Sequence, residues 1–173
     1  MTDPINFTEI VNKVPSLDDL LHTSEAEKSS KPEPVEISLD EAKQYLAEAV
    51  AEKGEAYIYQ EVKKPDSWET TCAYFDPDTK APSCIVGHVL DRKGVPFERM
   101  AGGDKNLFTD VQGLVDGRIL KVDNETYALL TLAQEFQDGG ISWGQAVKKA
   151  LENYEERAEE YDAEEYDDAD NWY

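Results

Sequence analysis

Two cysteines and a histidine in the middle of the chain have the side-chain chemistry for metal binding or nucleophilic catalysis. Cys84 and His88 are four residues apart, so on a helix they would share one face and could bind the same cation. Cys72 comes earlier in the chain and could supply a third ligand. A structural zinc site needs four ligands, and the fourth would have to be His22 or a carboxylate.

The same residues permit a catalytic interpretation, in which His88 activates the Cys84 thiol as a nucleophile. The sequence offers no evident third group that would orient the histidine. Free cysteines are among the most buried side chains in proteins. We therefore expect Cys72, Cys84 and His88 to be core residues, and we predict no catalytic residue, no bound metal and no cofactor. A small hydrolase or metal-binding enzyme that uses Cys84 and His88 is the alternative.

The sequence pattern of residues 37–151 predicts an α+β domain that would position these residues. Its small β-hairpin sheet packs against four to six helices, which are mostly C-terminal. Residues 57–62 and 70–75 are rich in β-branched and aromatic residues, so they predict the hairpin. Residues 118–122 predict a third strand or an extended link.

Capping residues mark where the helices begin. Ser38 with Glu41 forms a capping box. Ser83 follows a proline and can cap a helix that begins at Cys84, and Asp123 can cap a later helix. Gly87 inside the second of these helices favours close approach of another element, and we expect the helix of residues 124–138 to cross there. The predicted helices span residues 39–53, 84–93, 97–100, 107–115, 124–138 and 143 to about 160.

The charge of the chain excludes several classes of function. Its 173 residues include 38 acidic and 17 basic ones, which gives a formal charge of −21 and repels nucleic-acid phosphates. We therefore expect no direct binding of nucleic acid. No apolar stretch is long enough to span a membrane, and no secretory signal is visible. With two cysteines, a reducing cytoplasm is the expected location.

The negative charge is concentrated in an acidic C-terminal tail, residues 152–173, which has 11 acidic residues and one arginine. Because like charges repel at helical spacing, we expect the helix to fray after about residue 160. The tail either keeps the protein in solution or docks on a basic surface, in which case carboxylates steer the encounter and aromatic rings supply buried area. The predicted contacts are Glu155, Glu156, Glu159, Glu160, Tyr161, Asp162, Glu164, Glu165, Tyr166, Asp167, Asp168, Trp172 and Tyr173.

Residues 1–36 are predicted to form a flexible N-terminal arm and linker. Apolar residues recur at helical spacing over residues 7–14, and a second short helical turn follows over residues 17–21. Residues 23–36 are polar and contain two prolines, as is typical of a linker. The arm either docks on its own domain or binds a partner's groove. Its predicted partner contacts are Phe7, Ile10, Val11, Leu17, Leu20 and Leu21.

Two segments of the domain carry a resemblance to other proteins. Pro82-Ser-Cys-Ile-Val-Gly-His-Val-Leu90, with Gly94-Val-Pro96 after it, and Gln137-Asp-Gly-Gly140, with Trp143-Gly144 and Ala146, are similar to an uncharacterised group of small proteins of bacteriophages that infect actinobacteria. The resemblance covers about residues 38–150. It implies a phage origin and action in the bacterial cytoplasm, but no activity or catalytic residues.

These observations lead to one functional hypothesis. The chain is expected to be a non-enzymatic phage interaction protein, which binds and modulates a host or phage protein through its acidic and aromatic segments. A basic surface that normally holds nucleic acid would be a natural target, so inhibition by DNA mimicry is one form of the hypothesis. The alternatives are the small hydrolase or metal-binding enzyme described above and a structural component of the virion.

Overall fold

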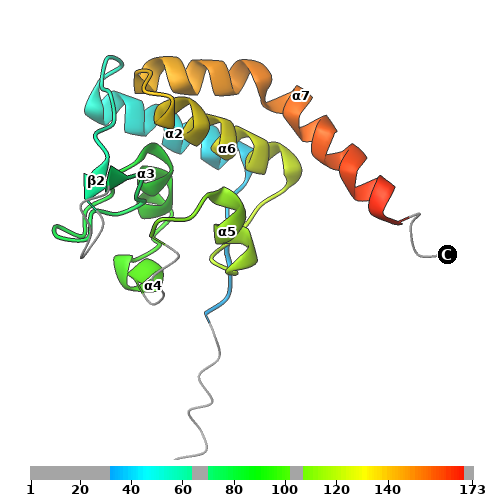
Figure 1. Ribbon diagram of the computed structural model, residues 1–173, viewed down its shortest axis with the longest axis horizontal. Coiled ribbons are helices and arrows are strands. Elements are labelled where there is room, and N and C mark those ends of the chain that lie inside the picture. The colour runs from blue at the N-terminus through cyan, green and yellow to red at the C-terminus, as the bar shows by residue number, and fades with distance from the viewer. Residues whose placement is uncertain (1–31, 64–69, 102–106, 170–173) are drawn as a thin grey trace, which may run out of the picture. The chain divides into compact units, whose positions relative to one another are not determined.

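The computed structural model describes residues 32–63, 70–101 and 107–169, and the chain from Glu33 onward belongs to one compact unit (Figure 1). The unit is mostly helical with two small sheets, so the helix-rich α+β class predicted from sequence is confirmed. Of the predicted N-terminal arm and linker, residues 1–36, residues 1–31 lie outside the described residues. The described helices are α2 (Leu39–Lys53), α3 (Ile85–Arg92), α4 (Phe97–Ala101), α5 (Val111–Asp116), α6 (Asn124–Asp138) and α7 (Trp143–Ala169).

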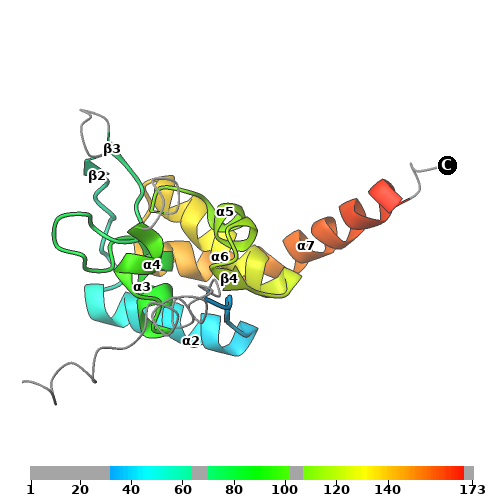
Figure 2. The same ribbon diagram turned by 90° about the horizontal axis from the view of Figure 1, so that it is seen from below.

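The core lies between the longer helices. α6 packs along α7 over much of its length, and α2 packs against α3, α6 and α7 (Figures 1 and 2). Each large apolar side chain removed from water contributes about 1.5–3 kcal/mol of favourable transfer free energy, so this layer dominates the stability. None of the described helices is long and apolar enough to cross a membrane. The largest fully buried side chains include Trp143, Tyr74, Phe75, Ile37, Leu46, Ile85, Leu90 and Leu129.

The first sheet pairs two segments that lie far apart in the sequence. β1 (Val35–Glu36) lies parallel to β4 (Leu120–Lys121), and the Val35 N–H donates to the Ile119 carbonyl at 2.9 Å. The expected strand or link at residues 118–122 is thus a strand, whereas the linker expected through residue 36 is wrong at its last two residues. The polar surroundings of β1 gave no local sign of it, because its partner lies far along the sequence.

The second sheet is the predicted hairpin, but it is much shorter than expected. β2 (Val62–Lys63) pairs antiparallel with β3 (Thr70–Thr71). The backbone groups flanking these strands bond to other elements instead. The Tyr57 carbonyl accepts from the N–H of Trp143 at 2.8 Å, and the Tyr74 N–H donates to the Leu107 carbonyl at 3.1 Å. Because these groups are satisfied elsewhere, the ladder does not extend.

Two of the predicted helix caps are present, and a third lies one residue later than predicted. The Ser38–Glu41 capping box is present, and the Asp123 carboxylate accepts the N–H of Thr126 at 2.8 Å. The cap of α3, however, is Cys84 and not Ser83. The Cys84 sulfur accepts the backbone N–H of Gly87 at 3.3 Å, so the helix begins one residue later than predicted. α5 is also shorter than expected, because Asp110 caps it.

Gly87 allows a close approach, but by a different partner from the one predicted. A Cβ built on Gly87 would lie 1.8 Å from the carbonyl oxygen of Tyr74, so the segment after β3 crosses there rather than α6. The atoms in contact belong to the Tyr74 backbone, which cannot rotate away as the end of a flexible side chain could. Any residue larger than glycine would therefore force α3 away from this segment.

α7 continues to Ala169 instead of ending near residue 160. Its inner face explains part of this difference. Tyr154 and Ala158 are buried, and the Tyr161 ring packs edge-on against Tyr127 with centroids 5.0 Å apart. Tertiary packing of one face therefore supports a helix whose charge pattern alone disfavours it.

Candidate functional site

The structure gives Cys84 and His88 separate surroundings. Cys84 is fully buried as the cap of α3, and His88 lies one turn later with its ring packed edge-on against Trp143, centroids 5.3 Å apart. No hydrogen bond joins the thiol to the imidazole in the described part of the chain. Both are core residues, as the sequence predicted. The nucleophile–base arrangement gains no support from this geometry.

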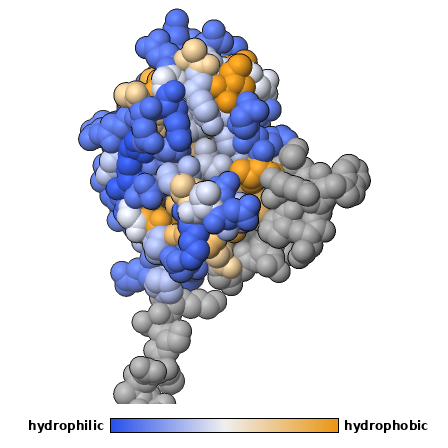
Figure 3. All heavy atoms as spheres, turned by 90° about the vertical axis from the view of Figure 1, so that its left-hand side faces the viewer, coloured by the Kyte–Doolittle hydropathy of each residue, from blue (hydrophilic) through white to orange (hydrophobic). Residues whose placement is uncertain are grey.

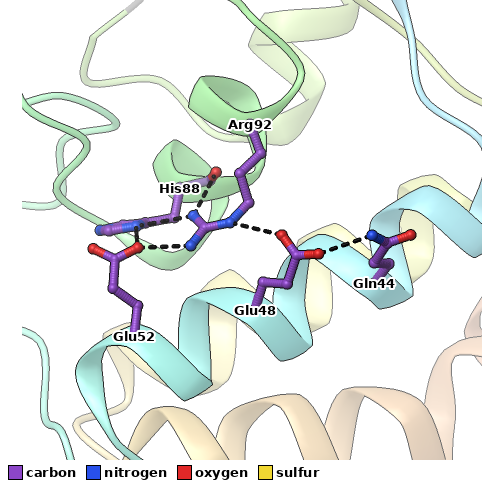
Figure 4. Close-up of polar contacts among 5 residues, drawn as sticks. All are labelled: Gln44, Glu48, Glu52, His88 and Arg92. Carbon is purple, nitrogen blue, oxygen red and sulfur yellow. Dashed lines mark hydrogen bonds and ion pairs between the residues drawn. The ribbon is translucent and has the colours of Figure 1, made fainter.

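His88 belongs to a polar network that joins α3 to α2 (Figure 4). The Arg92 guanidinium lies 3.3 Å from the Nδ1 of His88, donates to Glu52 at 2.6 Å and donates to Glu48 at 3.2 Å, and Gln44 extends the network to Glu48. Because Arg92 can only donate, Nδ1 accepts and the neutral ring carries its proton on Nε2. That buried Nε2 has no hydrogen-bond partner among the described atoms.

The electrostatics of this network keep the imidazole neutral. Burial lowers the pKa of His88, although the nearby Glu52 carboxylate acts in the opposite direction. The hydrogen bond from Arg92 lowers the pKa of Glu52, so that carboxylate stays charged. The network thus holds two helices together and leaves no imidazole nitrogen in contact with the Cys84 thiol.

The metal interpretation can be compared with the geometry of the described residues. Over residues 32–63, 70–101 and 107–169, no group of three or more histidine, cysteine or acidic side chains converges closely enough to hold an ion. His22, the suggested fourth ligand, lies outside this range.

A second polar cluster was not predicted from the sequence. The Cys72 sulfur accepts from the side-chain amides of Gln137 at 3.5 Å and Gln134 at 3.9 Å, and the Gln137 oxygen accepts the N–H of Ile85 at 2.7 Å. The Tyr74 hydroxyl donates to Gln134 at 3.1 Å. Two glutamines on the otherwise apolar face of α6 were the sequence signal for this cluster.

The outer face of α7 is acidic and exposed. Glu155, Glu156 and Glu159 are exposed and form no ion pair within the described residues, whereas Arg157 pairs with Glu135 and Glu160. Arg157 is the only basic residue after Lys149 in the sequence, so little positive charge compensates this face. Its exposed carboxylates are Glu152, Glu155, Glu156, Glu159, Glu160 and Asp162, which we call the acidic ridge.

The acidic ridge borders a small hollow beside the start of α6. Five carboxylates line this hollow of about 330 Å³, and the amide of Asn124 donates to Asp162 at 2.5 Å across it. On the inner side of α7 nearby, the ammonium of Lys43 donates to the Tyr154 hydroxyl at 3.0 Å. The carboxylates of the hollow are Asp123, Glu125, Glu155, Glu159 and Asp162.

The predicted partner contacts fall into three groups. Glu155, Glu156, Glu159, Glu160 and Asp162 are exposed on the acidic ridge, whereas Tyr161 turns inward against Tyr127. The backbone of residues 164–168 is helical, so Glu164, Glu165, Tyr166, Asp167 and Asp168 continue α7. The other predicted contacts lie outside the described residues: Phe7, Ile10, Val11, Leu17, Leu20, Leu21, Trp172 and Tyr173.

The described residues expose few large apolar side chains compared with the number of exposed carboxylates on the acidic ridge. Within the described residues, Ile58 and Leu151 are the large apolar side chains that stand exposed. On the face drawn in Figure 3, hydrophilic residues predominate and apolar residues form small separate groups. A groove of about 850 Å³ between α2 and α7 is lined largely by small apolar side chains such as Ala47, Val50 and Ala51.

Comparisons of the chain with protein-family models, with curated protein sequences and with solved structures find no match.

Proposed function

We propose that the chain is a non-enzymatic phage protein that acts in the bacterial host cytoplasm, where it binds and modulates a host or phage protein with a basic surface. The observation that supports this proposal is the acidic ridge, whose carboxylates are exposed while the opposite face of the same helix packs on the domain. Because the inner face fixes α7, the ridge presents its charges in a fixed array. An ordered helix loses less backbone freedom on binding than a flexible tail does.

The spacing of these charges supports DNA mimicry as the form of binding. With a rise of about 1.5 Å per residue, the six carboxylates from Glu152 to Asp162 extend over about 15 Å. This is one charge per about 3 Å, compared with about 1.7 Å along duplex DNA. Lysines and arginines arranged for phosphates on a partner would therefore meet a row of negative charges at a little over half the linear density of DNA.

The electrostatic character of the proposed contact also sets its dependence on salt. Exposed charges are screened over about 8 Å at physiological ionic strength, so association should weaken as salt is added. Carboxylates at the rim of an interface act mainly on the rate of association and on the choice of partner.

A capture experiment with matched variants tests the proposal. The triple variant Glu155→Gln, Glu156→Gln and Glu159→Gln removes three charges from the ridge. A control variant, Glu33→Gln, Asp78→Asn and Asp91→Asn, removes three exposed charges elsewhere. Each immobilised chain is exposed to lysate of the bacterial host at low salt, and the retained proteins are quantified by mass spectrometry.

We expect the wild type and the control variant to retain the same basic protein, and the ridge variant to retain much less of it. Duplex DNA added as a competitor should release that protein if its surface normally binds nucleic acid. Equal retention by the ridge variant and the wild type would contradict the proposal.

A further inference from the structure

The apolar groove and the acidic hollow follow one another along a single side of α7. The residues of α7 that line them include positions three or four apart, which share one side of a helix. These positions are Gly144, Lys148 and Leu151 in the groove, and Glu155, Glu159 and Asp162 in the hollow. An apolar surface therefore passes directly into an acidic one.

The two helices that form the groove run antiparallel. Near one end, the N–H of Gly144 donates to the carbonyl of Glu55, just after α2, at 3.1 Å. Near the other end, the ammonium of Lys43 donates to the hydroxyl of Tyr154 at 3.0 Å. The beginning of α2 thus lies beside the part of α7 where the hollow starts.

The walls of the groove suit a helix as its occupant. Ala47 and Ala51 of α2 line one wall, and small side chains let another helix approach closely. Leu151 of the other wall is 40% exposed, so an occupant would remove apolar surface from water. Because the backbone groups of both walls bond within their own helices, a strand could not pair with them. The recognition mode that fits is an amphipathic helix in a groove.

The charge of the hollow specifies the other half of the occupant. Asp123 and Glu125 at the start of α6 add to the carboxylates of α7, and none of the described residues that line the hollow is basic. Lysines or arginines on the occupant would therefore meet uncompensated negative charge. A second copy of this chain fits less well, because each copy carries a formal charge of −21 and like charges repel.

We propose that the groove and the hollow together bind one amphipathic helix of the partner, with its apolar residues over the groove and its lysines or arginines over the hollow. Gly144 and Asp162 are 18 positions apart, or about 27 Å along a helix, so the bound segment has about 18 residues. The inference rests on the proposed function, because it names the part of the partner that meets the acidic ridge.

A library of displayed peptides tests this site on the full chain. The peptides have about 18 residues, are randomised without proline, and are selected for binding at low salt. We expect the recovered peptides to carry apolar residues at positions i, i+3, i+4 and i+7 in one half and lysine or arginine in the other half.

Variants of the chain then test each half of the site with one recovered peptide, by fluorescence anisotropy. Leu151→Gln should weaken binding about fivefold, because part of an apolar contact is lost. Ile58→Gln is the matched control and should bind as the wild type does, since Ile58 is also exposed but does not line the groove. The double variant Glu155→Gln and Glu159→Gln should weaken binding at low salt and reduce its dependence on salt. Circular dichroism verifies each fold, and Ala51→Gln, which fills the groove from α2, is a second groove variant.

The outcomes separate this inference from the proposed function. Recovered peptides that are basic throughout, and that bind Leu151→Gln and the wild type equally, would overturn the inference and leave the proposed function standing. Recovered peptides without basic residues, or undiminished binding to the double variant, would contradict both. Recovery of no peptide would also overturn the inference.

Two further measurements identify a different occupant of the groove. A dimer of the free chain that Leu151→Gln dissociates, followed by sedimentation velocity, would assign the groove to a second copy. Binding of a synthetic peptide of residues 5–21 that Leu151→Gln weakens would assign it to a segment of this chain. Either result would overturn the inference.

Discussion

The side of α3 that faces α2 and the outer face of α7 both carry polar and charged side chains, but they use them in opposite ways. Around α3, Arg92 satisfies Glu48, Glu52 and His88 within the molecule. On α7, the acidic ridge leaves Glu156 and Glu159 without a hydrogen bond or ion pair in the described part of the chain. Groups that are satisfied internally stabilise the fold, whereas exposed and uncompensated charge is available to a partner. Under the proposed function, α3 therefore contributes to stability and α7 to recognition.

The largest expected effect on this comparison comes from Gly87→Ala. The added methyl group would collide with the Tyr74 backbone, so we expect a loss of about 3 kcal/mol or more in the free energy of unfolding. Urea unfolding followed by circular dichroism measures the change. Gly139→Ala is the control, because a Cβ at Gly139 would lie 3.3 Å from its nearest atom and needs only a small adjustment, whereas a Cβ at Gly87 would lie 1.8 Å away. Equal stability of Gly87→Ala and the wild type would show that this packing is not as close as described.

The next effect comes from the Arg92 network. Arg92→Met keeps the aliphatic stem but removes the bonds to Glu48, Glu52 and His88, so we expect a loss of about 2 kcal/mol in unfolding free energy. Lys148→Met is the matched control, since its pair with Glu152 is exposed and worth at most about 1 kcal/mol. If both variants lose the same stability, the proposed division between α3 and α7 fails.

A smaller effect concerns pH. Burial lowers the pKa of His88 below the value of about 6.5 expected in the unfolded chain. The unfolded state therefore binds the proton more readily, and the contribution of His88 to stability is present above the unfolded pKa and declines as pH falls through the folded pKa. Denaturant unfolding between pH 7.5 and 5 should show a steeper decline for the wild type than for His88→Gln. Parallel curves would show that the imidazole does not titrate between the two states.

The features of the fold that the sequence predicted correctly are those decided by neighbouring residues, and the features it missed depend on residues far apart in the chain. The Ser38–Glu41 box and the Asp123 cap were predicted correctly, because a cap is decided within four residues. β1 was missed because its partner, β4, lies 85 residues further along the chain. The partner of Gly87 was predicted wrongly for the same reason: glycine indicates that something approaches closely, but not which segment does.

The candidate site divides in the same way. The exposed carboxylates of α7 followed from composition and spacing alone. The inward position of Tyr161 did not, since it depends on Tyr127 of another helix. The cluster of Cys72 with Gln134 and Gln137 also required the tertiary structure, because its members come from segments about 60 residues apart.

The acidic ridge gives the smallest expected effect on stability. It also gives the most direct test of the proposal that the outer face of α7 binds a partner. The ridge variant Glu155→Gln, Glu156→Gln and Glu159→Gln should change the free energy of unfolding by about 0.5 kcal/mol or less, because these side chains are exposed. Its affinity for the captured basic partner is then measured by calorimetry across a series of salt concentrations, beside the wild type. We expect the wild type to bind more tightly at low salt and to lose affinity more steeply as salt rises. The same affinity and the same salt dependence in both proteins would contradict the assignment of recognition to the outer face of α7.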